Sequence, residues 1–162
     1  GVRLHDFCSR KYVHEVAIPN LRQGFERSGR DDGIWDAFEI TGGGMIATAA
    51  TEEELAGEVL DLRKRLAFYA STPAYRIQLE IEGYADEAEQ LTRLSKENRW
   101  ADMLEVFTED MAHRYAAIGT HDRIVERIRH HFDGVNTVQF SMPTRTAADL
   151  GVLGELIQDL KA

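Results

Sequence analysis

Short apolar segments at residues 1–7, 38–48 and 135–143 are separated by long stretches whose apolar residues recur at helical spacing. In the opening GVRLHDF, Val2 and Leu4 alternate with Arg3 and His5, as they do in a β-strand. Strands that are joined through helices pair in parallel, with right-handed crossover connections. The order of these segments therefore predicts an α/β fold built on a parallel sheet.

Capping residues mark where several helices begin. Thr51 and Glu54 form a T-x-x-E capping box. The apolar residues that follow are spaced by four, three, four and three positions: Leu55, Val59, Leu62, Leu66 and Tyr69. Ser9 is predicted to cap a helix that runs to about Arg27, with a kink at Pro19. Further helices are predicted over residues 85–118 (in two pieces), 120–132 and 146–160, the last burying Leu150, Leu153, Leu156, Ile157 and Leu160.

Two segments are ambiguous. The stretch FEITGGGMIAT at 38–48 is predicted as one buried strand, since its glycines lead into MIAT rather than into the helix that a phosphate-binding loop requires. Glycines inside a strand indicate a bulge or a close approach of two backbones. In YRIQLEIEGY, Ile77, Leu79 and Ile81 alternate with polar residues, a period that predicts a strand.

Composition limits the classes of function. The 162 residues suffice for a single domain, 1–162, and their net charge of −9 argues against nucleic acid or a membrane as a partner. Cys8 is the one cysteine, so no internal disulfide forms, and a reducing cytoplasmic location is expected. No Cys, His or carboxylate spacing fits a metal site, and no G-x-S-x-G motif supports a hydrolase.

The sequence resembles the luciferase-like monooxygenase superfamily, and within it the deazaflavin (coenzyme F-420)-dependent oxidoreductases. The resemblance is carried by KYVHEVAIPNLRQGFERSGR, TEEELAGEVLDLRKRLAFYASTPAYR and GT-x₂-RIVERIRHHF before VNTVQFSMP. It covers nearly all of this chain but only the C-terminal half of a family member. It implies the C-terminal part of a TIM-type (β/α)8 barrel, with three parallel strands (the sixth, seventh and eighth) and a helical insertion. The chain would then begin within a strand as a fragment, and residues 77–81 would be helical.

The resemblance also implies a site at the C-terminal ends of the strands. His5 is the predicted catalytic acid–base residue, with pairing to a backbone carbonyl as the alternative. The predicted substrate pocket comprises Asp6, Phe7, Thr48, Ser141 and Met142. The predicted cofactor-binding residues are Ser71, Thr72, Tyr75 and Arg76, for which the alternative is a helix end with an Arg76–Glu80 ion pair.

The implied activity is hydride transfer between the deazaflavin coenzyme F-420 or FMN and a small organic substrate. The cofactor site is expected to be incomplete in these 162 residues. The alternative is a non-catalytic half-barrel that dimerises through its exposed sheet edges, a homo-oligomer with a structural or binding role.

Overall fold

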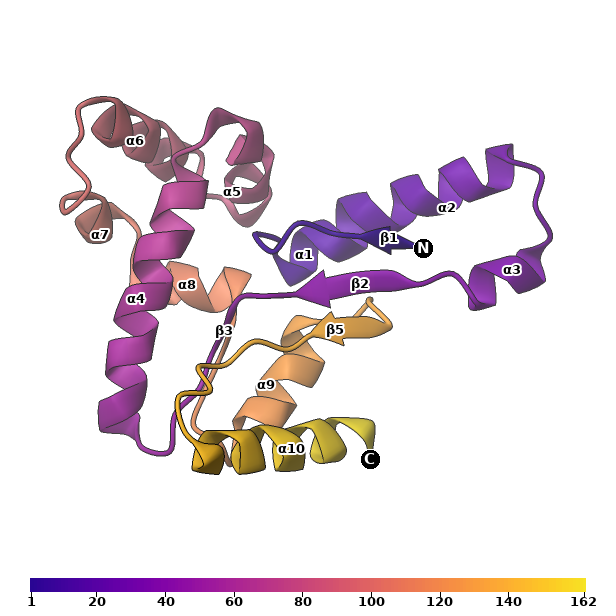
Figure 1. Ribbon diagram of the computed structural model, residues 1–162. Coiled ribbons are helices and arrows are strands. Elements are labelled where there is room, and N and C mark those ends of the chain that lie inside the picture. Colours follow the sequence, from indigo (N-terminus) through magenta and orange to yellow (C-terminus); the bar gives the residue numbers. More distant parts are fainter.

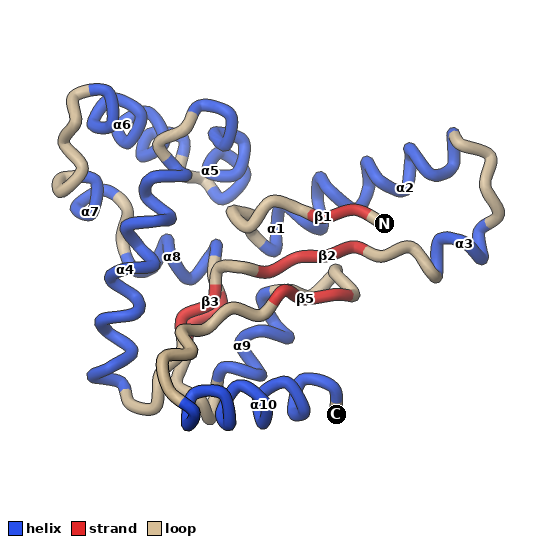
Figure 2. The backbone as a smooth tube through the Cα atoms, viewed as in Figure 1, coloured by secondary structure: helices blue, strands red, loops and turns tan.

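The strand segments pair as two short parallel sheets in the computed structural model, which describes the backbone of residues 1–162 and the side chains of residues 1–31 and 33–162 (Figure 1). One sheet has the order β1-β2-β5, and β3 pairs with β4 in the other (red in Figure 2). All three pairings are parallel, as predicted. The bounds are β1 (Val2–Arg3), β2 (Ile40–Gly43), β3 (Ile46–Ala47), β4 (Ala117–Ile118) and β5 (Thr137–Gln139).

The expected single strand over 38–48 is wrong, because its glycines divide it into β2 and β3. Gly43 and Gly44 have φ angles of +121° and +92°, which side chains with a Cβ rarely adopt. The chain bends there out of one sheet and into the other. The amide of Gly44 still donates to the carbonyl of Gln139 at 3.1 Å, so the bend keeps its contact with β5. The prediction of a close backbone approach is confirmed at Gly43, which lies against the backbone of Gln139.

Strand β4 lies where the sequence predicted the end of a helix. The amide of Ala117 donates to the carbonyl of Met45 at 3.0 Å, and that of Gly119 donates to Ala47 at 3.2 Å. Ala117 and Ile118 are both buried. A two-residue strand leaves no periodic signal in the sequence, so only its pairing with β3 identifies it. The chain therefore contributes four strand positions, β1, β2/β3, β4 and β5, instead of three.

The first long helix is interrupted by a segment that ends two residues before Pro19, the residue at which a kink was predicted. Ser9 caps it, its hydroxyl accepting a hydrogen bond from the amide of Tyr12 at 3.1 Å. A π-helical segment (Val13–Ala17) then separates α1 (Arg10–Tyr12) from α2 (Ile18–Arg27). Since proline has no amide hydrogen, a change of helical register at this point costs little. In the following loop Asp31 caps a short helix, α3 (Asp32–Asp36), that the sequence did not predict.

Helix α4 (Glu52–Ala70) agrees with the prediction, and its Thr51 cap accepts from the amide of Glu54. The strand predicted over 77–81 is wrong: this segment is helix α5 (Arg76–Glu82), the conformation that the family resemblance implied. The alternation was coincidental, because Leu79 is fully buried whereas Ile77 is 47% exposed. The remaining helices are α6 (Ala85–Lys96), α7 (Met103–Val106), α8 (Glu109–Tyr115), α9 (Ile124–His131) and α10 (Ala147–Lys161).

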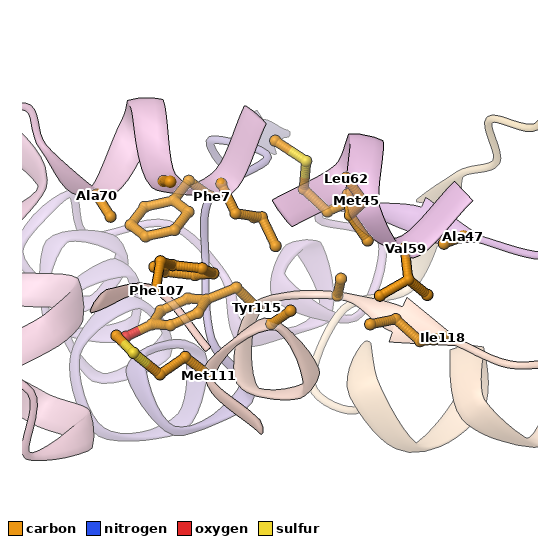
Figure 3. Close-up of a cluster of buried hydrophobic side chains, with 14 of the residues drawn as sticks. Phe7, Met45, Ala47, Val59, Leu62, Ala70, Phe107, Met111, Tyr115 and Ile118 are labelled. Atoms are coloured by element: carbon orange, nitrogen blue, oxygen red, sulfur yellow. The ribbon is translucent and has the colours of Figure 1, made fainter. Parts of the chain in front are cut away.

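Two apolar clusters hold these elements together. In the larger one Phe7 stacks on Tyr115, with 4.5 Å between the ring centroids, and Leu62 of α4 lies beside Met45 (Figure 3). The smaller cluster joins β3 and β4 to α9 and α10 through Ile46, Ala117, Ile124, Ile128 and Leu156. Leu150 was expected in the core but is 60% exposed, whereas Leu156 of the same helix is buried.

The faces of the β1-β2-β5 sheet differ in polarity. Paired residues of parallel strands share a face, so Arg3, Thr41 and Thr137 lie on one side. Arg3 and Thr137 are exposed, whereas Val2 and Ile40 on the other side are half-buried and buried. The sheet thus has a polar face open to solvent. Among the described residues, no helix is both long and apolar enough to span a membrane.

The bend at Gly43 gives a test of the fold. We expect Gly43→Ala to lower the free energy of unfolding by about 1–3 kcal/mol, since the new Cβ would adopt a strained φ and lie 2.7 Å from the backbone nitrogen of Gln139. Gly57→Ala is the matched control. Residue 57 lies inside α4 with nothing within 4 Å of an added Cβ, and alanine there should stabilise by about 0.5–1 kcal/mol. Urea unfolding followed by circular dichroism measures both, and equal effects would contradict the bend.

Candidate functional site

A cavity of about 520 Å³ lies between β1, the first long helix and the segment that joins α4 to α5. This volume falls within the range of small-molecule sites. His5 and Tyr75, two residues predicted from the sequence, both line it. The other lining residues are Arg3, Leu4, Cys8, Tyr12, Val16, Ala17, Asn20, Leu21, Ala74, Ile77 and Gln78.

Local signals place the two predicted residues. His5 follows the end of β1, where the amide of Leu4 makes the last pairing contact, to Thr41 at 2.9 Å. Pro73 ends the helical geometry of α4 and begins a 3₁₀ turn (Pro73–Tyr75) that carries Tyr75. The amide of Tyr75 donates to the carbonyl of Thr72 at 2.9 Å, which fixes the turn. The two side chains therefore approach each other from short, constrained segments.

His5 and Tyr75 are directly hydrogen-bonded. The Tyr75 hydroxyl lies 3.0 Å from Nε2 of His5, and the ring centroids are 4.5 Å apart. The other ring nitrogen of His5, Nδ1, accepts from the amide of Phe7 at 3.0 Å. Tyr69 packs edge-on against His5 at 5.1 Å. The partners of His5 are thus a backbone amide and a phenol, rather than the backbone carbonyl of the alternative interpretation.

The other predicted strand-end residues do not line this cavity. Asp6 forms an ion pair with Arg3 at 3.2 Å, and Phe7 is fully buried against Tyr115. Ser141 donates to the carbonyl of Gly44 at 3.0 Å, and Met142 packs against the smaller cluster. Thr48 is buried, and its hydroxyl has no hydrogen-bond partner among the described side chains and backbone.

The predicted cofactor-binding residues separate in space. The Ser71 and Thr72 hydroxyls both donate to the carbonyl of Phe68, at 2.8 and 3.4 Å, and so close the end of α4. Arg76 pairs with Glu80 at 2.7 Å, as in the helix-end alternative. Arg76 also lines a second cavity, of about 540 Å³, with Pro73, Glu89, Thr92, Arg93, Lys96 and Glu97. The turn at Pro73–Tyr75 thus stands between the two cavities.

Gln78 is a polar residue of the first cavity that sequence reasoning missed. It is only 5% exposed, and its amide nitrogen donates to Sγ of Cys8 at 3.5 Å. In the strand predicted over 77–81, Gln78 falls on the polar, solvent-facing side. Only the helical assignment places this polar residue on a buried face. Burial raises the pKa of the Cys8 thiol to about 11. Cys8 therefore remains a neutral, packed thiol near pH 7 rather than a reactive one.

His131 is the most strongly perturbed histidine. Burial lowers its pKa to about 4, and the neighbouring charge of His130 acts in the same direction. The His131 ring packs edge-on against Phe132 at 4.7 Å. Within the described residues, no group of three or more His, Cys, Asp or Glu side chains is placed to hold a metal ion. His131 therefore contributes to the pH dependence of stability.

Comparison with known proteins gives one family. The family model described as luciferase-like monooxygenase matches residues 4–137. Uncharacterized proteins of Mycobacterium tuberculosis and Mycobacterium bovis are each 38% identical to the chain over 157 residues, which is 97% of this chain and 45% of theirs. The chain thus spans about half the length of the curated relatives it matches. No solved structure matches it.

The His131 pKa predicts acid destabilisation. The unfolded chain takes up a proton near pH 6.5, whereas the folded chain takes it up only near pH 4, so the free energy of unfolding should fall as pH drops between these values. The full effect of this residue is about 3 kcal/mol. In His131→Gln this part of the pH dependence should vanish. Urea unfolding of the wild-type chain and the variant at pH 7.5 and pH 4.5 measures this pH dependence. The difference between the two proteins at pH 7.5 gives any loss of packing. Equal losses on acidification in both proteins would contradict the assignment.

Proposed function

Because this chain belongs to the luciferase-like monooxygenase family, we propose that it forms part of an oxidoreductase that moves a hydride between FMN or the deazaflavin coenzyme F-420 and a small organic substrate. The proposal rests on the family match together with a cavity lined by His5 and Tyr75. These two residues are 70 positions apart in sequence and are hydrogen-bonded to each other. His5 follows the C-terminal end of its strand, the end at which barrel enzymes carry their sites.

We propose that the complete protein is a TIM-type (β/α)8 barrel. Each of the four strand positions in this chain is followed by helix: β1 by α1 and α2, β2/β3 by α4, β4 by α9, and β5 by α10. Four of eight units agree with a chain that spans about half the length of its relatives. With β4 counted, the chain would supply four units, one more than the sixth, seventh and eighth strands expected from the sequence.

The two cavities suit different parts of a flavin-type cofactor or its substrate. The second cavity carries Arg76, Arg93 and Lys96 beside Glu89 and Glu97, a lining of mixed charge that fits a polar cofactor tail. The first carries aromatic and aliphatic walls with a few polar groups, which suit a ring system or an apolar substrate. The cofactor supplies the hydride chemistry when bound, and the side chains of this chain would orient the reactants and exclude water.

Cofactor titration tests this proposal. The 162-residue chain alone should bind FMN and coenzyme F-420 weakly or not at all, since half of a barrel supplies only part of the site. Co-expression with the part of the Mycobacterium tuberculosis relative that lies outside the matched 157 residues should give saturable binding, measured by cofactor fluorescence.

Lys96→Glu should weaken that binding about fivefold, because it reverses a charge in the second cavity. Lys64→Glu is the control, reversing a charge on the exposed side of α4. An assembled complex that binds neither cofactor, or one in which the two variants bind equally well, would count against the proposal.

We infer a second candidate function from the uncovered sheet: a half-barrel that pairs with another copy of itself. Arg3, Thr137 and Gln139 expose a polar face, and β1 and β5 each pair on one side only within the described residues. Unpaired parallel edges favour association with further strands. A copy that covers them would give a homodimer with a binding or structural role.

Light scattering coupled to size-exclusion chromatography measures this association. We expect the isolated chain to be dimeric at micromolar concentration. Arg3→Pro should shift it toward monomer, because the amides of Val2 and Leu4 pair with the β2 side and the Arg3 amide between them faces the open edge of β1, where proline removes the hydrogen. A strictly monomeric wild-type chain that unfolds cooperatively would rule this function out.

A further inference from the structure

The hydrogen bonds of His5 have a definite direction. The amide of Phe7 is only a donor, so Nδ1 of His5, 3.0 Å away, must present a lone pair. The proton of the neutral imidazole then sits on Nε2, where it donates to the Tyr75 oxygen at 3.0 Å. The hydroxyl hydrogen of Tyr75 cannot also point at His5. It is therefore directed elsewhere, and the described residues include no other partner for it.

The Tyr75 ring is held in place by its neighbours. Its centroid lies 5.9 Å from that of Tyr69 and 6.0 Å from that of Phe7, both in edge-to-face contacts. Phe7 is itself fixed by its buried stack on Tyr115. A donor whose ring and oxygen are both fixed loses little conformational entropy when it binds a ligand. The hydroxyl of Tyr75 is preorganised.

The cavity that Tyr75 lines is largely apolar. Its walls include the aliphatic side chains Leu4, Val16, Leu21 and Ile77. Most of its polar groups are already paired: Arg3 with Asp6 at 3.2 Å, Asn20 with the carbonyl of Val16 at 2.7 Å, and Gln78 with Cys8. Tyr12 also lines the cavity, but no neighbour orients its hydroxyl as His5 orients that of Tyr75. A ligand here would therefore meet aliphatic walls, the exposed Arg3 side chain and one hydroxyl donor that a neighbouring side chain orients.

We propose that this cavity binds an apolar small molecule that carries a carbonyl oxygen, and that the Tyr75 hydroxyl donates to that oxygen. His5 acts as a positioning residue through Tyr75 rather than as the group that meets the ligand. The inference rests on the proposed function, in which this cavity receives the organic substrate. It narrows the substrate class to carbonyl compounds or the alcohols related to them by hydride transfer.

Two probes of nearly the same shape test the donor. Acetophenone carries a carbonyl, and α-methylstyrene replaces it with a methylene group. In NMR shift titrations of the 162-residue chain, acetophenone should bind about three- to tenfold more tightly, the range of one neutral hydrogen bond. Tyr75→Phe should abolish this preference.

Tyr69→Phe is the matched control, because it removes a hydroxyl from the same aromatic cluster without touching the His5 hydrogen bond. It should keep the preference for acetophenone. Equal binding of the two probes by the wild-type chain, binding of neither in this cavity, or the same loss in both variants would overturn the inference.

The role of His5 has a separate readout. Long-range ¹H–¹⁵N correlation spectra at pH 8 should show the His5 proton on Nε2, in the wild-type chain and in Tyr75→Phe alike, because the Phe7 amide sets the tautomer. His5→Phe keeps an aromatic ring but removes the contact to the Tyr75 oxygen, and it should reduce the preference for acetophenone. A proton on Nδ1 would overturn the assigned directions of the two His5 hydrogen bonds. None of these measurements uses a cofactor, so their failure is distinguishable from failed cofactor binding.

Discussion

The bend at Gly43 and Gly44 is the constraint on which the rest of the structure depends. It makes β2 and β3 one continuous stretch that belongs to two sheets, so β1 and β5 attach on one side of the bend and β4 on the other. An added Cβ at Gly43 would collide with the backbone of Gln139, so only glycine allows β2 and β5 to approach this closely. Both apolar clusters pack against residues that immediately follow the bend, Met45 in the larger and Ile46 in the smaller.

The candidate site takes its geometry from the larger cluster. Phe7 is fully buried in this cluster and anchors the chain just after β1. It therefore holds His5, two residues earlier, in the lining of the first cavity. Tyr115, stacked under Phe7, donates through its hydroxyl to the carbonyl of Gln78 at 3.0 Å. That contact ties α8 to α5 and therefore to the turn that carries Tyr75. The hydrogen-bonded side chains of His5 and Tyr75 are thus held in place by packing in the interior.

The chain belongs to the luciferase-like monooxygenase family and spans about half the length of its curated relatives. Both facts bear on how its sheet is covered. A sheet whose polar face is open and whose outer strands are each paired on one side is unusual for a self-sufficient α/β domain, because parallel sheets are normally covered on both faces. Completion by further strand–helix units, or by another copy, would bury the same surfaces. The two proposed functions are thus alternative ways of satisfying one physical requirement.

The sequence by itself determined the features that depend on near neighbours. These are the caps at Ser9 and Thr51 and the amphipathic spacing of α4. Each follows from chain contacts or periodicities within a few residues. Tertiary structure decided what local patterns leave open. Leu79 is fully buried as part of helix α5, although the alternation around it favours a strand. Strand β4 exists because β3 pairs with it, and His5 meets Tyr75 because folding brings together segments 70 positions apart, a distance that no local pattern encodes.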